Sequence, residues 1–405
     1  MPTRVPRAWL FLGPSFVAAV AYVDPGNFAT NVQAGSETGY RLVWVVLVAN
    51  VAAMVVQIQS AKLGLVSGRN LPEQIRDRAP GRVVVAAWLG AEVMAMATDL
   101  AELLGAGLGL GLLTGLPLFP ATVIAAGGTV LLLGLQRRGT APFEAVIAAL
   151  VGVIAVSYLV ETVMGKPDLS AVARSFAPPR LGGRENVLLA TGILGATVMP
   201  HVIYLHSALM QDRGRGADES TLRRMLRAQR TDVSLVLALA GVINMLMVML
   251  AAATFHRRGL VHVAGIEQAQ RTLQPILGAA SSAIFALALL ASGLSSSAVG
   301  TFAGQVIMRG FLRRAVPLWL RRAVTMLPAL VIAASGVDAT RALVISQVVL
   351  SFGIPQALIP LAWLNGRRDV LGVFRNRAVV SLPVWGLVGL ITTLNVFLLV
   401  RVFGL

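Results

Sequence analysis

Residues 21–31 read AYVDPGNFATN, and this stretch interrupts an apolar segment that begins near residue 8. Because proline has no N–H to donate, Pro25 leaves the carbonyl of Ala21 without its helical partner, and Gly26 permits the chain to unwind. Backbone of this kind is tolerated at membrane depth only where it lines a cavity walled by protein. Asp24 and Asn27 place a charged and a neutral oxygen beside the free carbonyl, a combination of ligands that suits a cation.

A second interruption, GATVMPHVIYLH at residues 195–206, follows the same chemistry. Pro200 frees the carbonyl of Ala196, and Met199 offers a thioether next to it. The two breaks fall in the first and sixth apolar segments, a pattern typical of transporters built from inverted five-helix repeats with a binding site at the membrane midplane. The alternative is that the two prolines only kink their helices and that Met199 faces lipid.

The apolar segments that frame these breaks run the length of the 405-residue chain. Only 13% of the residues are charged, about half the share of a soluble domain, which excludes an ordinary soluble enzyme. A helix of about 20 residues crosses a bilayer. We therefore expect an all-α polytopic membrane protein with eleven transmembrane helices, at residues 8–23, 42–66, 83–113, 118–135, 141–164, 187–210, 232–256, 276–308, 316–335, 342–364 and 378–403.

These segments are expected to form one transmembrane domain over residues 1–405, with inverted repeats at about 8–164 and 187–364 and an extra span at 378–403. The net charge of +16 is typical of basic cytoplasmic loops in a membrane protein and does not indicate nucleic-acid binding. Basic residues favour a cytoplasmic N-terminus, and the odd number of spans then places the C-terminus outside. The chain has no cysteine, which excludes disulfides and thiolate metal sites.

The third apolar segment carries a stripe of acids at Glu92, Asp99 and Glu102, whose spacings of seven and three place them on one helix face. Charges in a membrane are costly, so this face should line a water-filled route or meet basic partners. His201, beside the second break, titrates near physiological pH and could pass on a proton. The candidate basic partners are Arg213, Arg321 and Arg322. The alternative is a static salt-bridge network.

Three motifs resemble those of the Nramp family (natural resistance-associated macrophage proteins): DPGN at 24–27, ATDLAE at 97–102 and MPH at 199–201. Their order and spacing match over essentially the whole chain. The resemblance implies a LeuT-like fold and proton-coupled import of divalent transition metals. It implies these metal ligands: Asp24, Asn27, Met199 and the carbonyls of Ala21 and Ala196. It adds Gln347, which matches a residue that family members bring to the metal on occlusion; a polar contact between helices is the alternative.

The predicted function is therefore proton-coupled import of Mn²⁺, Fe²⁺ and similar ions by alternating access, and not enzymatic catalysis. Its expected partners are the metal ions, protons and the lipids of the plasma membrane, with no resident cofactor and with a monomer as the working unit. One alternative is an Nramp-related Mg²⁺ transporter, which a thioether ligand disfavours. Another is a sodium-coupled amino-acid transporter of the same fold, which the anionic Asp24 disfavours. A membrane metalloprotease would need a histidine pair four residues apart or a matched catalytic acid, and neither is present. His201 and His206 are five apart, and His206 is expected to pack between helices.

Overall fold

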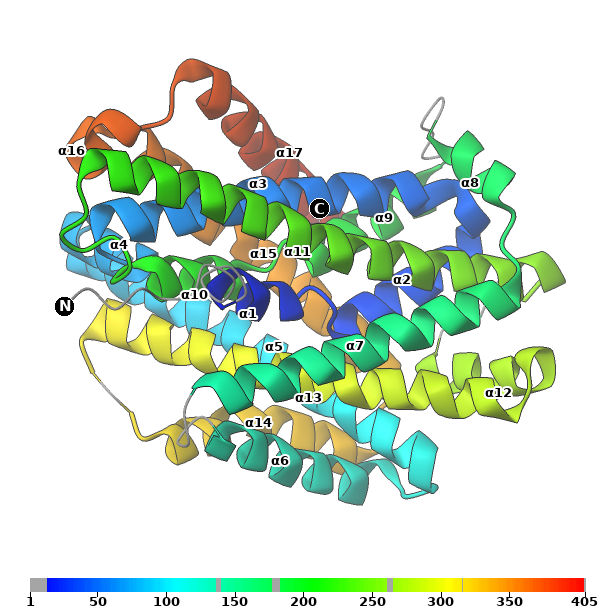
Figure 1. Cartoon of the computed structure of the whole chain (residues 1–405). Coiled ribbons are helices and arrows are strands. Elements are labelled where there is room, and N and C mark those ends of the chain that lie inside the picture. The colour runs from blue at the N-terminus through cyan, green and yellow to red at the C-terminus, as the bar shows by residue number, and fades with distance from the viewer. Residues whose placement is uncertain (1–12, 136–139, 177–182, 261–264, 315, 404–405) are drawn as a thin grey trace.

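The computed structural model describes residues 13–135, 140–176, 183–260, 265–314 and 316–403. Within these ranges every regular element is a helix, and the long helices lie side by side in one bundle (Figure 1). The first half of the chain forms α1 (Pro14–Val20), α2 (Pro25–Thr38), η1 (Gly39–Leu42), α3 (Val43–Ser67), α4 (Leu71–Arg78), α5 (Gly81–Thr114), α6 (Leu118–Leu135), α7 (Thr140–Gly165) and α8 (Leu169–Ser175).

The second half repeats the pattern of long helices joined by short ones. It forms α9 (Arg184–Thr197), α10 (Pro200–Met210), α11 (Glu219–Thr254), η3 (His256–Arg258), α12 (Ile266–Leu277), α13 (Ala279–Leu312), α14 (Leu318–Ser335), α15 (Ala339–Gly366), α16 (Arg368–Leu371), η4 (Gly372–Phe374) and α17 (Ala378–Phe403). Both predicted breaks are present: residues 21–24 separate α1 from α2, and residues 198–199 separate α9 from α10.

Nine helical stretches in the described ranges are long and apolar enough to cross a bilayer, and they coincide with nine of the eleven predicted segments. Of the other two, the segment predicted at 8–23 starts outside the described residues, and its described part is the seven-residue α1. The segment predicted at 316–335 is α14, an 18-residue helix that carries Arg321 and Arg322. The all-helical membrane fold is confirmed, and the count of eleven spans stays a prediction.

The first predicted span, at 8–23, was wrong in its end point, because the helix resumes after the break and α2 continues to Thr38. Hydropathy falls at the polar residues of α2, yet the structure buries them. The Thr30 hydroxyl donates to the Gly26 carbonyl at 3.1 Å, and the Asn31 amide donates to Asn244 of α11 at 3.1 Å. These contacts satisfy the polar side chains inside the bundle, as buried polar groups require.

The longest contact in the bundle lies between α5 and α13, each 34 residues long. Glycines allow the two backbones to approach closely. A Cβ atom on Gly109 would lie 2.5 Å from the backbone nitrogen of Leu290, and one on Gly293 would lie 2.5 Å from that of Ala106. Small residues at such contacts are the usual means of close helix packing in membranes. This pair of helices fixes the acid stripe of α5 against α13.

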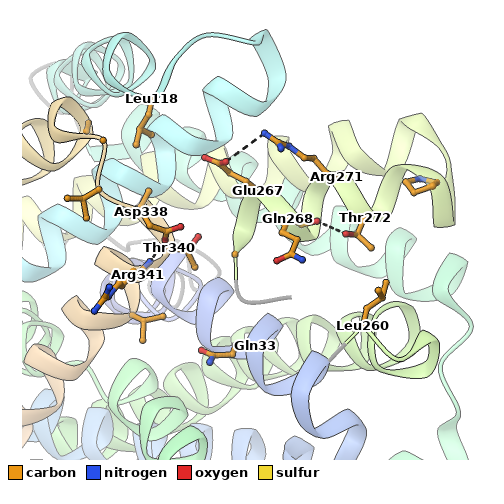
Figure 2. Close-up of a pocket in the computed structure, with 17 residues that line it drawn as sticks. Gln33, Leu118, Leu260, Glu267, Gln268, Arg271, Thr272, Asp338, Thr340 and Arg341 are labelled. Atoms are coloured by element: carbon orange, nitrogen blue, oxygen red, sulfur yellow. Dashed lines mark hydrogen bonds and ion pairs between the residues drawn. The ribbon is translucent and has the colours of Figure 1, made fainter. Parts of the chain in front are cut away.

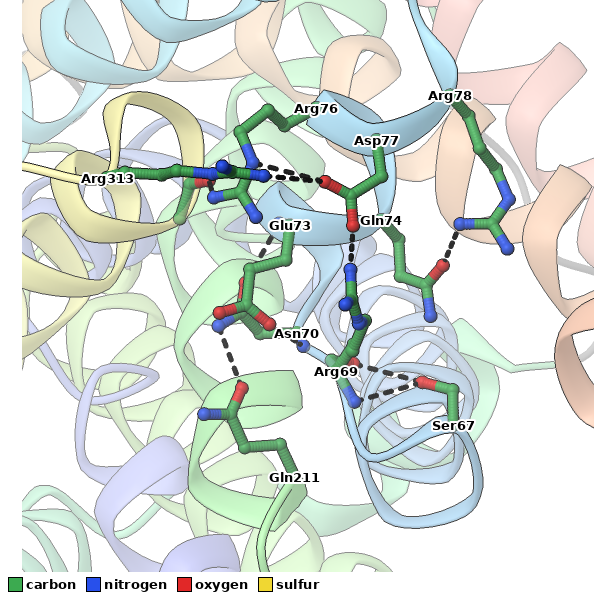
Figure 3. A network of polar contacts seen from close by, with 11 residues as sticks. Ser67, Arg69, Asn70, Glu73, Gln74, Arg76, Asp77, Arg78, Gln211 and Arg313 are labelled. Atoms are coloured by element: carbon green, nitrogen blue, oxygen red, sulfur yellow. Dashed lines mark hydrogen bonds and ion pairs between the residues drawn. The ribbon is translucent and has the colours of Figure 1, made fainter.

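At the end of the bundle where α1 begins, α4 ties several helix ends together through polar contacts (Figure 3). The Asn70 side chain caps α4 and donates to Gln211, just beyond α10, at 2.8 Å. The carboxylate of Asp77 meets three guanidinium groups, from Arg69, Arg76 and Arg313. This network links the ends of α3, α10 and α13.

Candidate metal site and polar pathway

The first break is organised by Asp24, which is 2% exposed and forms the N-cap of α2. Its two carboxylate oxygens accept hydrogen bonds from the backbone nitrogens of Gly26 at 3.0 Å and Asn27 at 3.1 Å. The amino end of a helix favours an anion, since its first N–H groups have no partners within the helix. The start of α2 therefore holds this carboxylate in place, and lone pairs remain on its oxygens for a cation.

The second break has the same layout with a different side chain at the cap. Met199 occupies the N-cap position of α10 in an extended conformation, and Pro200 begins the helix. Neither Met199 nor Ala196 is appreciably exposed. Because Pro200 has no N–H, the Ala196 carbonyl has no backbone donor one helical turn further on, as the sequence predicted.

Asn27 connects the two breaks. Its Nδ2 atom lies 2.6 Å from Asp24 Oδ1, 3.2 Å from the Tyr22 carbonyl and 3.4 Å from the Ala196 carbonyl, and it donates to all three. Its Oδ1 atom is buried and has no hydrogen-bond partner among the described residues. Buried polar atoms without partners are uncommon in proteins. The structure thus brings the Asp24 carboxylate, the Asn27 amide and the Ala196 carbonyl together.

Gln347 of α15 lies beside this group. A Cβ atom on Gly26 would lie 1.9 Å from Gln347 Nε2 and 2.8 Å from Asp24 Oδ2, so the amide rests against the first turn of α2 next to the carboxylate. The Oε1 atom of Gln347 is buried and has no partner in the part of the chain that the structure describes. The ligand role that the resemblance implies for Gln347 stays a prediction.

The close contact between Gly26 and the Gln347 amide leads to a testable prediction. We expect Gly26→Ala to lower Mn²⁺ uptake about tenfold, since an added methyl displaces the Gln347 amide and overpacking costs about 1–3 kcal/mol. Gly192→Ala in α9 is the matched control, because a Cβ there meets nothing within 4 Å. Uptake by reconstituted proteoliposomes measures both variants. Equal uptake by the two would show that the Gln347 amide moves away at no cost and has no part in binding.

The acid stripe of α5 meets basic partners, as predicted. Arg321 of α14 donates to both oxygens of Glu92, at 3.1 and 3.0 Å. Arg322 donates to Asp99 Oδ1 at 3.3 Å, and both side chains are 4% exposed. A Cβ atom on Gly300 would lie 2.7 Å from Glu102 Oε2 and 3.4 Å from Asp99 Oδ1, so these two carboxyl groups converge on one point of α13.

Arg213 does not share in these ion pairs, so its predicted partnership with the stripe is wrong. In the described ranges the arginines bound to the stripe are Arg321 and Arg322. Arg213 follows α10 at the end of the bundle where α1 begins, and its guanidinium flanks Gly13 together with Glu144 of α7. The sequence places Arg213 at a helix end but does not tell which neighbour that end meets.

His201 lies between the metal site and the stripe. Its Nδ1 atom is 3.1 Å from the hydroxyl of Thr98, the residue before Asp99, while its Nε2 atom is buried without a partner among the described residues. His206 is completely buried and bonds to the neighbouring helix α3, as expected of a residue that packs between helices. Its Nδ1 atom lies 2.8 Å from Gln57 Oε1, and Gln57 Nε2 donates to the Tyr22 hydroxyl at 2.7 Å. The signal that sequence reasoning missed is an amide at position 57 within an apolar segment.

A cavity of about 1190 Å³ lies toward the end of the bundle opposite α1, where α2, α12 and the start of α15 meet (Figure 2). Two acids line it, Glu267 of α12 and Asp338 at the N-cap of α15. Glu267 also pairs with Arg271, with 4.0 Å between the charged atoms. Gln33 of α2 lines the same cavity, six residues beyond Asn27 along the helix. The cavity therefore lies beyond the metal site along α2, toward the C-terminal end of that helix.

Two broken helices that meet around a buried carboxylate, inside a bundle of apolar helices, define a membrane transporter with a cation site at the crossing of the breaks. Residues 15–401 match the sequence profile of the natural resistance-associated macrophage protein-like (Nramp) family. The divalent metal cation transporter MntH of Deinococcus radiodurans is 51% identical over 403 residues, which are 100% of this chain and 92% of the relative.

Solved structures of other transporters have the same fold. The crystal structure of a manganese transporter from Eremococcus coleocola superposes with a TM-score of 0.88 at 34% identity, over 98% of this chain and 88% of that one. The structure of MhsT with L-phenylalanine shares the fold alone, with a TM-score of 0.62 at 12% identity over 96% of this chain and 98% of that one. The chain belongs to the Nramp family, and it is a membrane transporter with a LeuT-like fold rather than an enzyme, as predicted.

Proposed function

We propose that this protein imports Mn²⁺, Fe²⁺ and similar divalent transition metals into the cytoplasm together with protons. The observation that carries the proposal is the meeting of Asp24, Asn27 and the Ala196 carbonyl at two helix breaks, with the thioether of Met199 in the second break. Hard oxygen donors beside a soft sulfur suit first-row transition metals better than Mg²⁺ or Ca²⁺. The names of the bacterial relatives, divalent metal cation transporters, support the same substrate class.

The direction of transport follows from electrostatics. At 100 mV, inside negative, each positive charge that enters gains about 2.3 kcal/mol, so a divalent ion gains about 4.6 kcal/mol. We place the protein in the plasma membrane with its N-terminus in the cytoplasm and its C-terminus outside, working as a monomer. The cavity lined by Glu267 and Asp338 then opens to the outside, and the charges of Arg271 and Arg341 in its wall balance those of the two acids.

The proton route runs through α5. His201 contacts Thr98 and lies next to the metal site, and the carboxyl groups of Glu102 and Asp99 follow along the helix. Beyond them the ion pairs Asp99–Arg322 and Glu92–Arg321 continue the polar line toward α14. A proton that leaves the site thus has titratable groups on a helix that supplies none of the proposed metal ligands. Metal and proton can travel by separate paths.

The test is metal uptake by proteoliposomes that contain the purified protein and a pH-sensitive dye, scanned across divalent ions. We expect Mn²⁺ to enter and the lumen to acidify with it, faster at low external pH. Uptake of Mg²⁺ in preference to Mn²⁺ would favour the Mg²⁺ transporter, and sodium-dependent amino-acid uptake would favour the other alternative. Either result would overturn the proposal.

The separate paths predict the behaviour of Asp99→Asn. Its Mn²⁺ affinity should stay within about threefold of wild type, since no metal ligand changes, while metal-driven proton influx falls about tenfold or more. Calorimetry measures the affinity, and the dye measures the influx. Glu102→Gln should show the same split more weakly. A loss of Mn²⁺ affinity in Asp99→Asn as large as in Asp24→Asn would make Asp99 a metal ligand and would end the relay hypothesis.

A further inference from the structure

The unwound segment between α1 and α2 contains the backbone carbonyls of Ala21, Tyr22 and Val23, and the ligand set that the family resemblance implies includes only that of Ala21. The last turn of α1 closes with hydrogen bonds from the nitrogens of Tyr22 and Val23 to Ala19 and Val20. In the described part of the chain, no backbone N–H donates to the carbonyls of Ala21, Tyr22 or Val23. A divalent cation would attract each of these oxygens, because carbonyls are good ligands for such ions.

The Val23 carbonyl is held from α13. The hydroxyl of Ser292 donates to it at 2.7 Å, across 269 residues of sequence. Ser292 is completely buried, so water does not compete for this contact. A buried hydrogen bond of this kind is costly to remove, because the carbonyl is then left without a partner.

The Tyr22 carbonyl is held from α11. Asn244, also completely buried, donates from Nδ2 to this carbonyl at 2.9 Å. Its own Oδ1 atom accepts from Asn31 Nδ2 at 3.1 Å, which fixes the amide so that its donor faces Tyr22. Asn27 donates to the same carbonyl, but its amide must turn for Oδ1 to face a metal. Asn244 therefore keeps the Tyr22 carbonyl bonded when Asn27 changes partner.

We propose that Ser292 and Asn244 are positioning residues that hold the Val23 and Tyr22 carbonyls away from the metal, so that Ala21 alone supplies backbone oxygen from the first break. The proposal rests on the metal site of the proposed function and adds a reason for its selectivity. Ca²⁺ takes six to eight oxygen ligands, whereas a site with few oxygens and one sulfur leaves it incompletely coordinated. Releasing a second carbonyl adds an oxygen and favours Ca²⁺.

The experiment compares Ca²⁺ with Mn²⁺ affinity, by calorimetry, in purified Ser292→Ala, Ser292→Thr and Ser295→Ala. Ser292→Thr keeps the hydroxyl. Among the described residues, the Ser295 hydroxyl bonds within its own helix, to the Ser292 carbonyl at 3.1 Å. In Ser292→Ala we expect the affinity for Ca²⁺ relative to Mn²⁺ to rise about tenfold, the size expected for one lost hydrogen bond. The other two variants should match wild type. Asn244→Ala, measured in parallel, should shift the ratio in the same direction.

A ratio of affinities is insensitive to partial unfolding, which lowers the binding capacity for both ions alike. If Ser292→Ala and Asn244→Ala weaken both ions equally, or leave both unchanged, these residues are structural only and the inference is overturned. Asp24→Asn serves as the reference for the site itself. Loss of Mn²⁺ binding in Asp24→Asn with an unchanged ratio in Ser292→Ala refutes the positioning role alone, whereas retained binding in Asp24→Asn refutes the proposed metal site.

Discussion

Asp24→Asn should lower Mn²⁺ uptake about a hundredfold or more while the protein stays folded. The carboxylate is the only formal charge among the proposed ligands, and losing one partner of a buried charge pair costs about 3–5 kcal/mol. The fold should tolerate the change, because asparagine is as good an N-cap as aspartate and its single Oδ1 can still accept from one of the two nitrogens, of Gly26 or Asn27, that the carboxylate binds. Uptake by proteoliposomes and thermal melting of the purified protein measure the two effects separately.

Asp218→Asn provides the matched control. Asp218 is the N-cap of α11, on the exposed stretch before the helix, and accepts from the backbone nitrogen of Thr221 at 3.3 Å. Asp218→Asn changes a helix N-cap of the same type at α11, far from the proposed metal ligands, so Mn²⁺ uptake should be unchanged. Near wild-type Mn²⁺ uptake by Asp24→Asn would show that the site has been placed wrongly.

Met199→Ala should change which ions the transporter accepts. A thioether binds Mn²⁺, Fe²⁺ and Cd²⁺, whereas Ca²⁺ and Mg²⁺ gain almost nothing from sulfur in place of oxygen. Alanine makes room for a water in the vacated position, and the oxygen ligands remain. We expect measurable Mn²⁺ uptake, a greater loss of Cd²⁺ than of Mn²⁺ affinity, and competition by Ca²⁺ that is stronger by up to about a hundredfold, or 3 kcal/mol.

The measurement is inhibition of Mn²⁺ uptake by millimolar Ca²⁺ in mutant and wild type side by side. Met210→Ala is the control, since Met210 is buried at the other end of α10, where it packs against Leu65 and Leu226. That change also removes a buried thioether but leaves the break intact. If Met199→Ala discriminates against Ca²⁺ as well as wild type does, the size of the cavity or the dehydration step governs selectivity instead of the sulfur.

The helix breaks could be predicted because their cause is local. Pro25 and Pro200 remove a hydrogen bond one turn back, and no distant contact can restore a missing N–H. The partners of Glu92 and Asp99 could also be anticipated, since charges in a membrane need compensation. These inferences depend on the chemistry of a few neighbouring residues. They do not require knowledge of how the helices pack.

The features that sequence reasoning missed are contacts between distant segments. Ser292 and Asn244 meet the unwound segment across 269 and 222 residues, and nothing near either residue indicates that meeting. For the same reason the sequence pairs Arg213 with the wrong neighbours. The first predicted span ends before α2 begins, because the partner of the polar Asn31 lies on the distant helix α11. In each case the three-dimensional packing decides whether a polar residue in an apolar segment is satisfied.

The Asn27 amide has a consequence for the transport cycle. Its NH₂ group donates to Asp24 and to the Ala196 carbonyl, so two of the proposed ligands have a partner inside the protein. An importer must bring its vacant binding site back across the membrane after each delivery, and a vacant site with bare oxygens would make that return slow. An internal donor that substitutes for the departed ion lowers this barrier. We therefore expect net accumulation of metal without exchange of one metal ion for another.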